Sequence, residues 1–152
     1  METVTVERVI DAPIEDVFAW LTTTTNYTSS PLVLRCSLTR RGLAAPYGVG
    51  AVRRHLWLIG WFRERVTHYE APHCTEYVVE RSLPPSRHEL GRMTFTEVDG
   101  GTRVCWTTRA EVRIPLFAAS LTRLLVRPVI AGTFRNILDA ADTALTRAPS
   151  LK

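Results

Sequence analysis

Three side chains suited to acid–base chemistry and to ligand binding occur on neighbouring β-rich segments of the 152-residue chain: His55, Glu64 and Arg81. An imidazole has an unperturbed pKa of about 6.5, so His55 suits proton transfer near neutral pH. A carboxylate between two cationic groups stays ionised, and Arg81 suits pairing with a carboxylate or an enolate oxygen. Glu89 extends this row next to Arg81. The alternative interpretation is an ion network that only satisfies charges near the mouth of a cavity.

The spacing of two hairpins predicts that these three side chains share one face of a sheet. A two-residue turn at Ile59-Gly60 sets His55 opposite Glu64. The other face then opposes arginine to arginine, which is tolerable only in water. The face with His55 and Glu64 is therefore predicted to be the concave one. Similar matching around the next turn sets Glu64 beside Arg81.

The same registers predict a largely apolar wall around this row. They place Val66 beside Val79 and His68 beside Tyr77, whereas His88 has the outward parity. Apolar walls with a few polar groups are typical of a small-molecule pocket, although the same side chains also suit a packed core. The predicted ligand-binding side chains are Trp57, Phe62, Val66, His68, Tyr77, Val79, Met93, Phe95, Val104, Trp106, Phe117, Leu121, Phe134 and Leu138.

Alternating apolar and polar residues predict seven strands that carry these positions. Links of hairpin length join most of them, which predicts an antiparallel sheet. A short helix that begins near Pro13 follows the first strand. The predicted strands are Thr3–Ile10, Leu32–Arg41, Ala51–Leu58, Trp61–Glu70, Cys74–Leu83, Arg87–Val98 and Thr102–Ile114.

One long amphipathic helix is predicted from Pro115 to about Arg147, where it covers the apolar face of the sheet. Proline suits a first helical position, and apolar residues recur at helical steps. Pro128 predicts a kink or break near Leu124–Arg127, because it removes a hydrogen bond and clashes with the preceding turn. Strands followed by a helix predict one α+β domain over residues 1–147, with 148–152 as a loose tail.

Composition argues against several classes of protein. The net charge of +4 is spread along the chain without a basic run, which argues against nucleic-acid binding. Cys36, Cys74 and Cys105 lack metal-ligand spacing and predict reduced thiols in the cytoplasm, with no metal site. The most apolar window, residues 114–134, contains two arginines and argues against an integral membrane segment. No motif predicts a cofactor, and the oligomeric state stays open.

Two stretches carry a family resemblance. Val6–Leu21 is similar to the strand, Ala-Pro corner and Val-Phe helix that open helix-grip domains, and Trp61–Pro72 is similar to their middle strand and turn. On these residues the chain resembles the START-like (SRPBCC) superfamily, within it the polyketide cyclase/dehydrase and lipid-transport group. The resemblance implies a curved seven-stranded antiparallel sheet wrapped around the C-terminal helix, with a cavity for an apolar ligand. The chain departs from the family at Tyr27, because the expected aromatic–x–x–Trp segment lacks its tryptophan.

Three functions are compatible with these features. The preferred hypothesis is the binding of a hydrophobic small molecule, such as a lipid or a polyketide-like or isoprenoid compound, under the helix. The second is an enzyme of the polyketide cyclase/dehydrase type that uses His55, Glu64 and Arg81 for acid–base chemistry. The third is a regulator that binds another protein through its arginine-rich strands. The superfamily includes all three kinds of protein, so fold alone does not choose among them.

Overall fold

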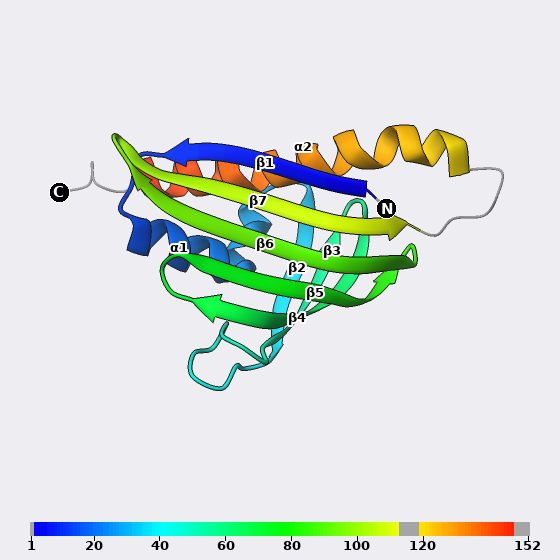
Figure 1. Cartoon of the computed structure of the whole chain (residues 1–152), viewed down its shortest axis with the longest axis horizontal. Helices are drawn as coiled ribbons and strands as arrows, with labels where there is room; N and C mark the ends of the chain where they lie inside the picture. The colour runs from blue at the N-terminus through cyan, green and yellow to red at the C-terminus, as the bar shows by residue number, and fades with distance from the viewer. Residues whose placement is uncertain (1, 113–118, 148–152) are drawn as a thin grey trace.

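Seven antiparallel strands form one curved sheet in the computed structural model, which describes the backbone of residues 2–112 and 119–147 and the side chains of residues 2–111 and 126–146. The strand order is β1-β7-β6-β5-β4-β3-β2, so the first strand lies beside the last (Figure 1). The predicted α+β class and antiparallel sheet are confirmed. The strands are β1 (Glu2–Ile10), β2 (Val33–Arg40), β3 (Val52–Trp57), β4 (Gly60–Glu70), β5 (Cys74–Leu83), β6 (Ser86–Val98) and β7 (Gly101–Val112).

Two short helices follow β1. The helix α1 (Ile14–Thr22) begins after Pro13, whose carbonyl accepts the first backbone hydrogen bonds of the helix. The 3-10 helix η1 (Thr24–Ser29) then turns the chain toward β2. Its Tyr27 is buried and donates a hydrogen bond from its hydroxyl to the Leu21 carbonyl at 2.6 Å, which ties the two helices together.

The last helix, α2 (Ala119–Arg147), runs alongside β1 and covers one face of the sheet (Figure 1). It continues through Pro128, so of the predicted kink or break, the break does not occur. The predicted start at Pro115 lies outside the described residues. Arg8 of β1 holds the far end of the helix, because its guanidinium contacts the carboxylates of both Asp139 and Asp142.

The core lies between α2, α1 and the half of the sheet formed by β1, β6 and β7. Phe134 of α2 stacks on Trp106 of β7, with ring centres 3.9 Å apart and planes 5° from parallel. Trp57 of β3 meets the same phenylalanine edge-on at 6.2 Å. Burial of such aromatic side chains removes a large apolar area from water and fixes α2 on the sheet.

The β3–β4 hairpin differs from the predicted register by two residues. Its turn is Leu58-Ile59, and Gly60 is the first residue of β4, opposite Trp57. Gly60 adopts a φ of +153°, and a Cβ there would lie 2.5 Å from the Leu83 carbonyl oxygen, so the strand accepts only glycine at this point. A shift of two residues changes the partners but keeps the faces. Arg53 therefore lies opposite Glu64, which the prediction had paired with His55.

Two β-bulges between β4 and β5 overturn the rest of the predicted row. The bulge at Arg63/Glu64 pairs Arg63 with Arg81 on the outer face and Glu64 with Val79 on the inner face. Arg81 is therefore exposed, and its predicted contact with Glu64 is wrong. The predicted pairs of Val66 with Val79 and of His68 with Tyr77 are also wrong, because the turn sets Glu70 opposite Cys74, one residue away from the predicted register. The second bulge, between Val66 and His68, pairs Val66 with Tyr77, and His68 with Glu76, which leaves His68 exposed.

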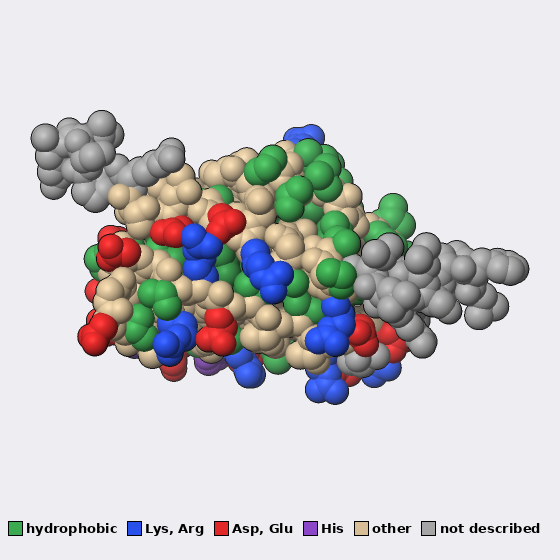
Figure 2. All heavy atoms as spheres, turned by 90° about the horizontal axis from the view of Figure 1, so that it is seen from above, with side chains coloured by type: hydrophobic (Ala, Val, Ile, Leu, Met, Phe, Trp, Pro, Cys, Tyr) green, Lys and Arg blue, Asp and Glu red, His purple; other side chains and the backbone are tan. Residues whose placement is uncertain are grey.

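The surface over β1 and α2 carries interspersed basic and acidic side chains, as Figure 2 shows. Glu89 also lies on the surface, where it pairs with Arg109 at 3.2 Å, so it does not extend an inner row. None of the helices in the described part of the chain has the length and apolar character to cross a membrane.

Candidate ligand-binding cavity

A cavity of about 340 Å³ lies between α2 and side chains of strands β3 to β7. Phe134 and Trp57 form part of its wall, and Trp106 lies buried beneath the same phenylalanine. Its volume falls within the range of about 300–1,000 Å³ that is usual for small-molecule sites. The lining side chains are Trp57, Ile59, Phe62, Glu64, Tyr77, Val79, Pro84, Ser86, His88, Thr108, Ala110, Val126, Val129, Ile130 and Phe134.

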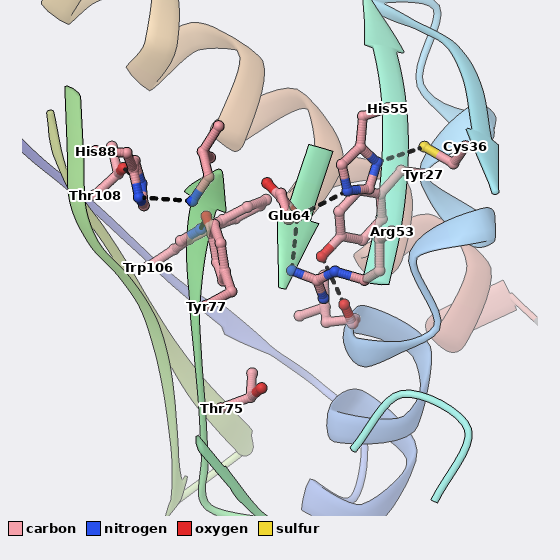
Figure 3. A network of polar contacts seen from close by, with 12 residues as sticks. Tyr27, Cys36, Arg53, His55, Glu64, Thr75, Tyr77, His88, Trp106 and Thr108 are labelled. Carbon is pink, nitrogen blue, oxygen red and sulfur yellow. Dashed lines mark hydrogen bonds and ion pairs between the residues drawn. The ribbon is translucent and has the colours of Figure 1, made fainter. Parts of the chain in front are cut away.

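A buried polar cluster on β3 and β4 reaches this cavity through one member, Glu64 (Figure 3). One oxygen of Glu64, Oε1, accepts hydrogen bonds from Arg53 Nη2 at 2.7 Å and His55 Nε2 at 2.8 Å. The other ring nitrogen of His55 lies 3.1 Å from Cys36 Sγ, and Tyr27 stacks on the imidazole. Arg53, His55 and Glu64 are 4%, 1% and 6% exposed, so all three side chains are buried.

The protonation states in this cluster follow from burial and from its charges. Burial alone would raise the pKa of Glu64, but His55 and Arg53 outweigh it and lower that pKa to about 2. Burial and the Glu64 charge raise the pKa of Cys36 to about 12. Burial also raises the pKa of Tyr27. At neutral pH the cluster therefore holds a carboxylate, a protonated thiol and a protonated phenol.

His88 occupies a gap between β5 and β6. The backbone pairing of these strands ends at Tyr77 and Gly91. Beyond that point the Val79 N–H donates to His88 Nδ1 at 3.1 Å, and His88 Nε2 lies 2.9 Å from Thr108 Oγ1. Burial lowers the pKa of His88, although the charge of Glu64 opposes this shift. The neutral imidazole is the form that accepts the Val79 hydrogen bond.

The predicted ligand-binding side chains separate into several groups. Five line the cavity: Trp57, Phe62, Tyr77, Val79 and Phe134. Six others are buried but do not line it: Val66 on β4, and Met93, Phe95, Val104, Trp106 and Leu138, which belong to the core between β6, β7 and α2. His68 is exposed, Phe117 lies outside the described residues, and the side chain of Leu121 does too.

Of the predicted polar row, the structure brings together two members. His55 and Glu64 share a face and are in contact, as the hairpin parity predicts. Arg81 is exposed on the other face. Its place beside Glu64 is taken by Arg53, whose inward parity follows from the same hairpin but which was not selected as a site residue.

Comparison with known proteins identifies the family of this domain. The family model described as "polyketide cyclase / dehydrase and lipid transport" matches residues 1–146. The chain belongs to this family. No curated protein matches the sequence.

Solved structures similar to this polyketide cyclase / dehydrase and lipid transport domain share its fold. A protein of Thermus thermophilus is 19% identical, with a TM-score of 0.81, and the match covers 97% of this chain and 99% of that one. A START superfamily protein from Mycobacterium smegmatis is 14% identical, with a TM-score of 0.74 and coverage of 95% and 97%. The di-domain ARO/CYC BexL from the BE-7585A biosynthetic pathway is 18% identical, with a TM-score of 0.74, and the match covers 97% of this chain and 51% of BexL. Identities this low establish the helix-grip fold alone.

In this member of the family, sequence reasoning missed two polar residues near the cavity. His88 has outward parity only if β6 is regular, and the bulge between His88 and Leu90 turns it inward. Arg53 was predicted opposite Val66, and only the observed register sets it opposite Glu64. The family and the fold neighbours together point to a ligand-binding domain of the START/polyketide cyclase type.

Proposed function

We propose that the domain binds a hydrophobic small molecule, such as a lipid or a polyketide-like or isoprenoid compound, in the cavity between the sheet and α2. The observation that carries this proposal is the cavity itself, with a volume of about 340 Å³ and a wall made mostly of aliphatic and aromatic side chains. Transfer of an apolar molecule from water to such a wall is favourable by about 25 cal/mol for each Å² buried.

The arrangement of the polar groups supports binding over catalysis. A general base works best when its pKa lies near the working pH. Glu64 lines the cavity, but the lowering of its pKa to about 2 by His55 and Arg53, against the effect of burial, makes it a weak base. His55 is 1% exposed and does not line this cavity, so it reaches a ligand only through Glu64. A cyclase/dehydrase activity is therefore the secondary proposal.

Filling the cavity tests the proposal. Val79 lines the cavity on β5, and its neighbour Val78 faces the other side of the sheet. We expect purified protein analysed by native mass spectrometry and lipid extraction to carry apolar ligand, which Val79→Trp excludes and Val78→Trp retains. Equal ligand content in both variants, or a purified protein that neither carries nor takes up apolar compounds, would contradict the proposal.

A further inference from the structure

The carboxylate of Glu64 presents one oxygen to the protein and the other to the cavity. Oε1 accepts both hydrogen bonds from Arg53 and His55. Among the described residues, none donates to Oε2, and Figure 3 shows this oxygen turned away from Arg53 and His55. Because Glu64 lines the cavity, Oε2 is a hydrogen-bond acceptor available to a bound molecule.

Most other polar side chains of the lining already have partners, and the buried Nε1 of Trp57, which has none among the described residues, is a donor and not an acceptor. His88 uses both ring nitrogens, one for the Val79 N–H and one for Thr108. The hydroxyl of Ser86 lies 2.8 Å from that of Ser82. The Tyr77 hydroxyl accepts a hydrogen bond from Trp106 Nε1 at 2.9 Å. The strongest unused acceptor in the wall is therefore the Glu64 carboxylate.

The charge of this carboxylate is balanced from behind the wall. Arg53 is 4% exposed and is not among the lining residues, so its guanidinium neutralises Glu64 without facing the cavity. An ammonium group entering an apolar cavity would lose its water and find a carboxylate that is already paired. A carboxylate group would meet another carboxylate oxygen. A neutral hydroxyl loses the least water and supplies the donor that Oε2 lacks.

We infer that the ligand of this cavity is an uncharged apolar molecule with a hydroxyl group, which donates its hydrogen bond to Glu64 Oε2. This inference rests on the proposed function, because it names the polar group of the molecule that the cavity holds. It excludes fatty acids and other carboxylates as the preferred ligands, in contrast to the carboxylate partner expected for Arg81.

A matched series of small aromatic compounds tests the inference on the unmodified protein. Isothermal titration calorimetry at pH 7 would compare 2-naphthol, 2-methoxynaphthalene, 2-naphthoate and 2-naphthylmethylammonium. A hydrogen bond to a charged acceptor corresponds to a gain in affinity of about tenfold or more. We expect 2-naphthol to bind at least about tenfold more tightly than the methyl ether, and both ions to bind more weakly than 2-naphthol. Equal binding of naphthol and ether, or preference for either ion, would overturn the inference.

The variant Glu64→Gln tests whether Oε2 is responsible. Arg53 and His55 both donate to the Oε1 position, so the amide oxygen must lie there and the amide NH₂ must face the cavity. A donor then replaces the acceptor, and the preference for naphthol over the ether is expected to disappear. The control Glu80→Gln removes a carboxylate that pairs with Arg65 at 2.8 Å on the outer face, and it should keep the preference.

The two proposals fail in different ways. If all four compounds bind with equal affinity and Val79→Trp abolishes their binding, the cavity is the binding site but recognises shape alone. If none of the four compounds binds, or if Val79→Trp leaves the naphthol affinity unchanged, the proposed function fails and the hydroxyl preference fails with it. If Glu64→Gln does not fold, the comparison of the four compounds on the unmodified protein still decides the inference.

Discussion

Replacement of Arg53 by methionine is expected to reduce the free energy of unfolding by about 3–5 kcal/mol, the usual cost of removing one partner from a buried ion pair. The guanidinium is buried, donates to Glu64 at 2.7 Å and lies 5.0 Å from the centre of the Tyr77 ring. Methionine keeps an unbranched apolar side chain of similar reach but leaves the buried Glu64 carboxylate with one cationic partner fewer. The direction is consistent with the pKa of Glu64: burial alone would raise it, but His55 and Arg53 together lower it to about 2, so the carboxylate depends on its cationic partners.

Arg81→Met is the matched control for this prediction. Arg81 is exposed and lies opposite Arg63, so its loss should change the free energy of unfolding by less than about 0.5 kcal/mol. Urea unfolding followed by tryptophan fluorescence measures both variants. The double variant Arg53→Met with Glu64→Met removes both charges, and it should be more stable than Arg53→Met alone. Equal costs for Arg53→Met and Arg81→Met would refute the assignment of Arg53 as the buried partner.

Two further predictions concern pH and a single glycine. Burial alone would raise the pKa of Glu64, but His55 and Arg53 lower it to about 2. The ionised Glu64 side chain therefore contributes its full stabilisation above about pH 4.5, and this contribution should be lost as the pH falls toward 2. His88 has a pKa lowered by burial, so its contribution is complete above about pH 6.5 and declines below it. Thermal unfolding measured from pH 7 to pH 2 should show both losses, and Glu64→Gln should remove the lower one. Gly91→Ala should destabilise the domain by about 1–3 kcal/mol, because the added Cβ would lie 2.2 Å from Tyr77 Cζ. The same exchange at Gly132 meets no atom within 4 Å and should be neutral or stabilising, so equal effects at the two glycines would contradict this account.

The sequence was sufficient to predict the strands, the final helix and the concave face. Alternation defines which residues share a face, and Arg54 lies opposite an arginine both in the predicted register (Arg65) and in the observed one (Arg63), so this face must meet water. That argument survives a shift of two residues, because such a shift preserves parity. The contact between His55 and Glu64 was predicted correctly for this reason, although the two residues are diagonal neighbours in the sheet.

The β-bulges were the part of the site that alternation could not predict. Each bulge inserts one extra residue into one of two paired strands, so the positions beyond it on that strand change face. Three bulges, at Arg63/Glu64, Val66/His68 and His88/Leu90, decide that Arg81 and His68 face water and that His88 faces inward. No proline or glycine adjoins the two bulges between β4 and β5, and Gly91 next to the third was not sufficient to predict it, so the errors in three polar residues followed from local backbone irregularity.

The concave face is tightly packed around Trp106 and open at the cavity beside Glu64, and this difference also has a physical cause. Around Trp106, Phe134 stacks on the indole ring and apolar side chains fill the space beneath α2. Around the cavity, the wall contains the carboxylate of Glu64. If apolar side chains moved into the cavity and packed against Oε2, this oxygen would lose its contact with water or ligand and would gain no hydrogen-bond donor. An unpaired buried acceptor of this kind costs about 1–3 kcal/mol, and more when it is charged. The same carboxylate that gives the cavity its polar group therefore opposes its collapse.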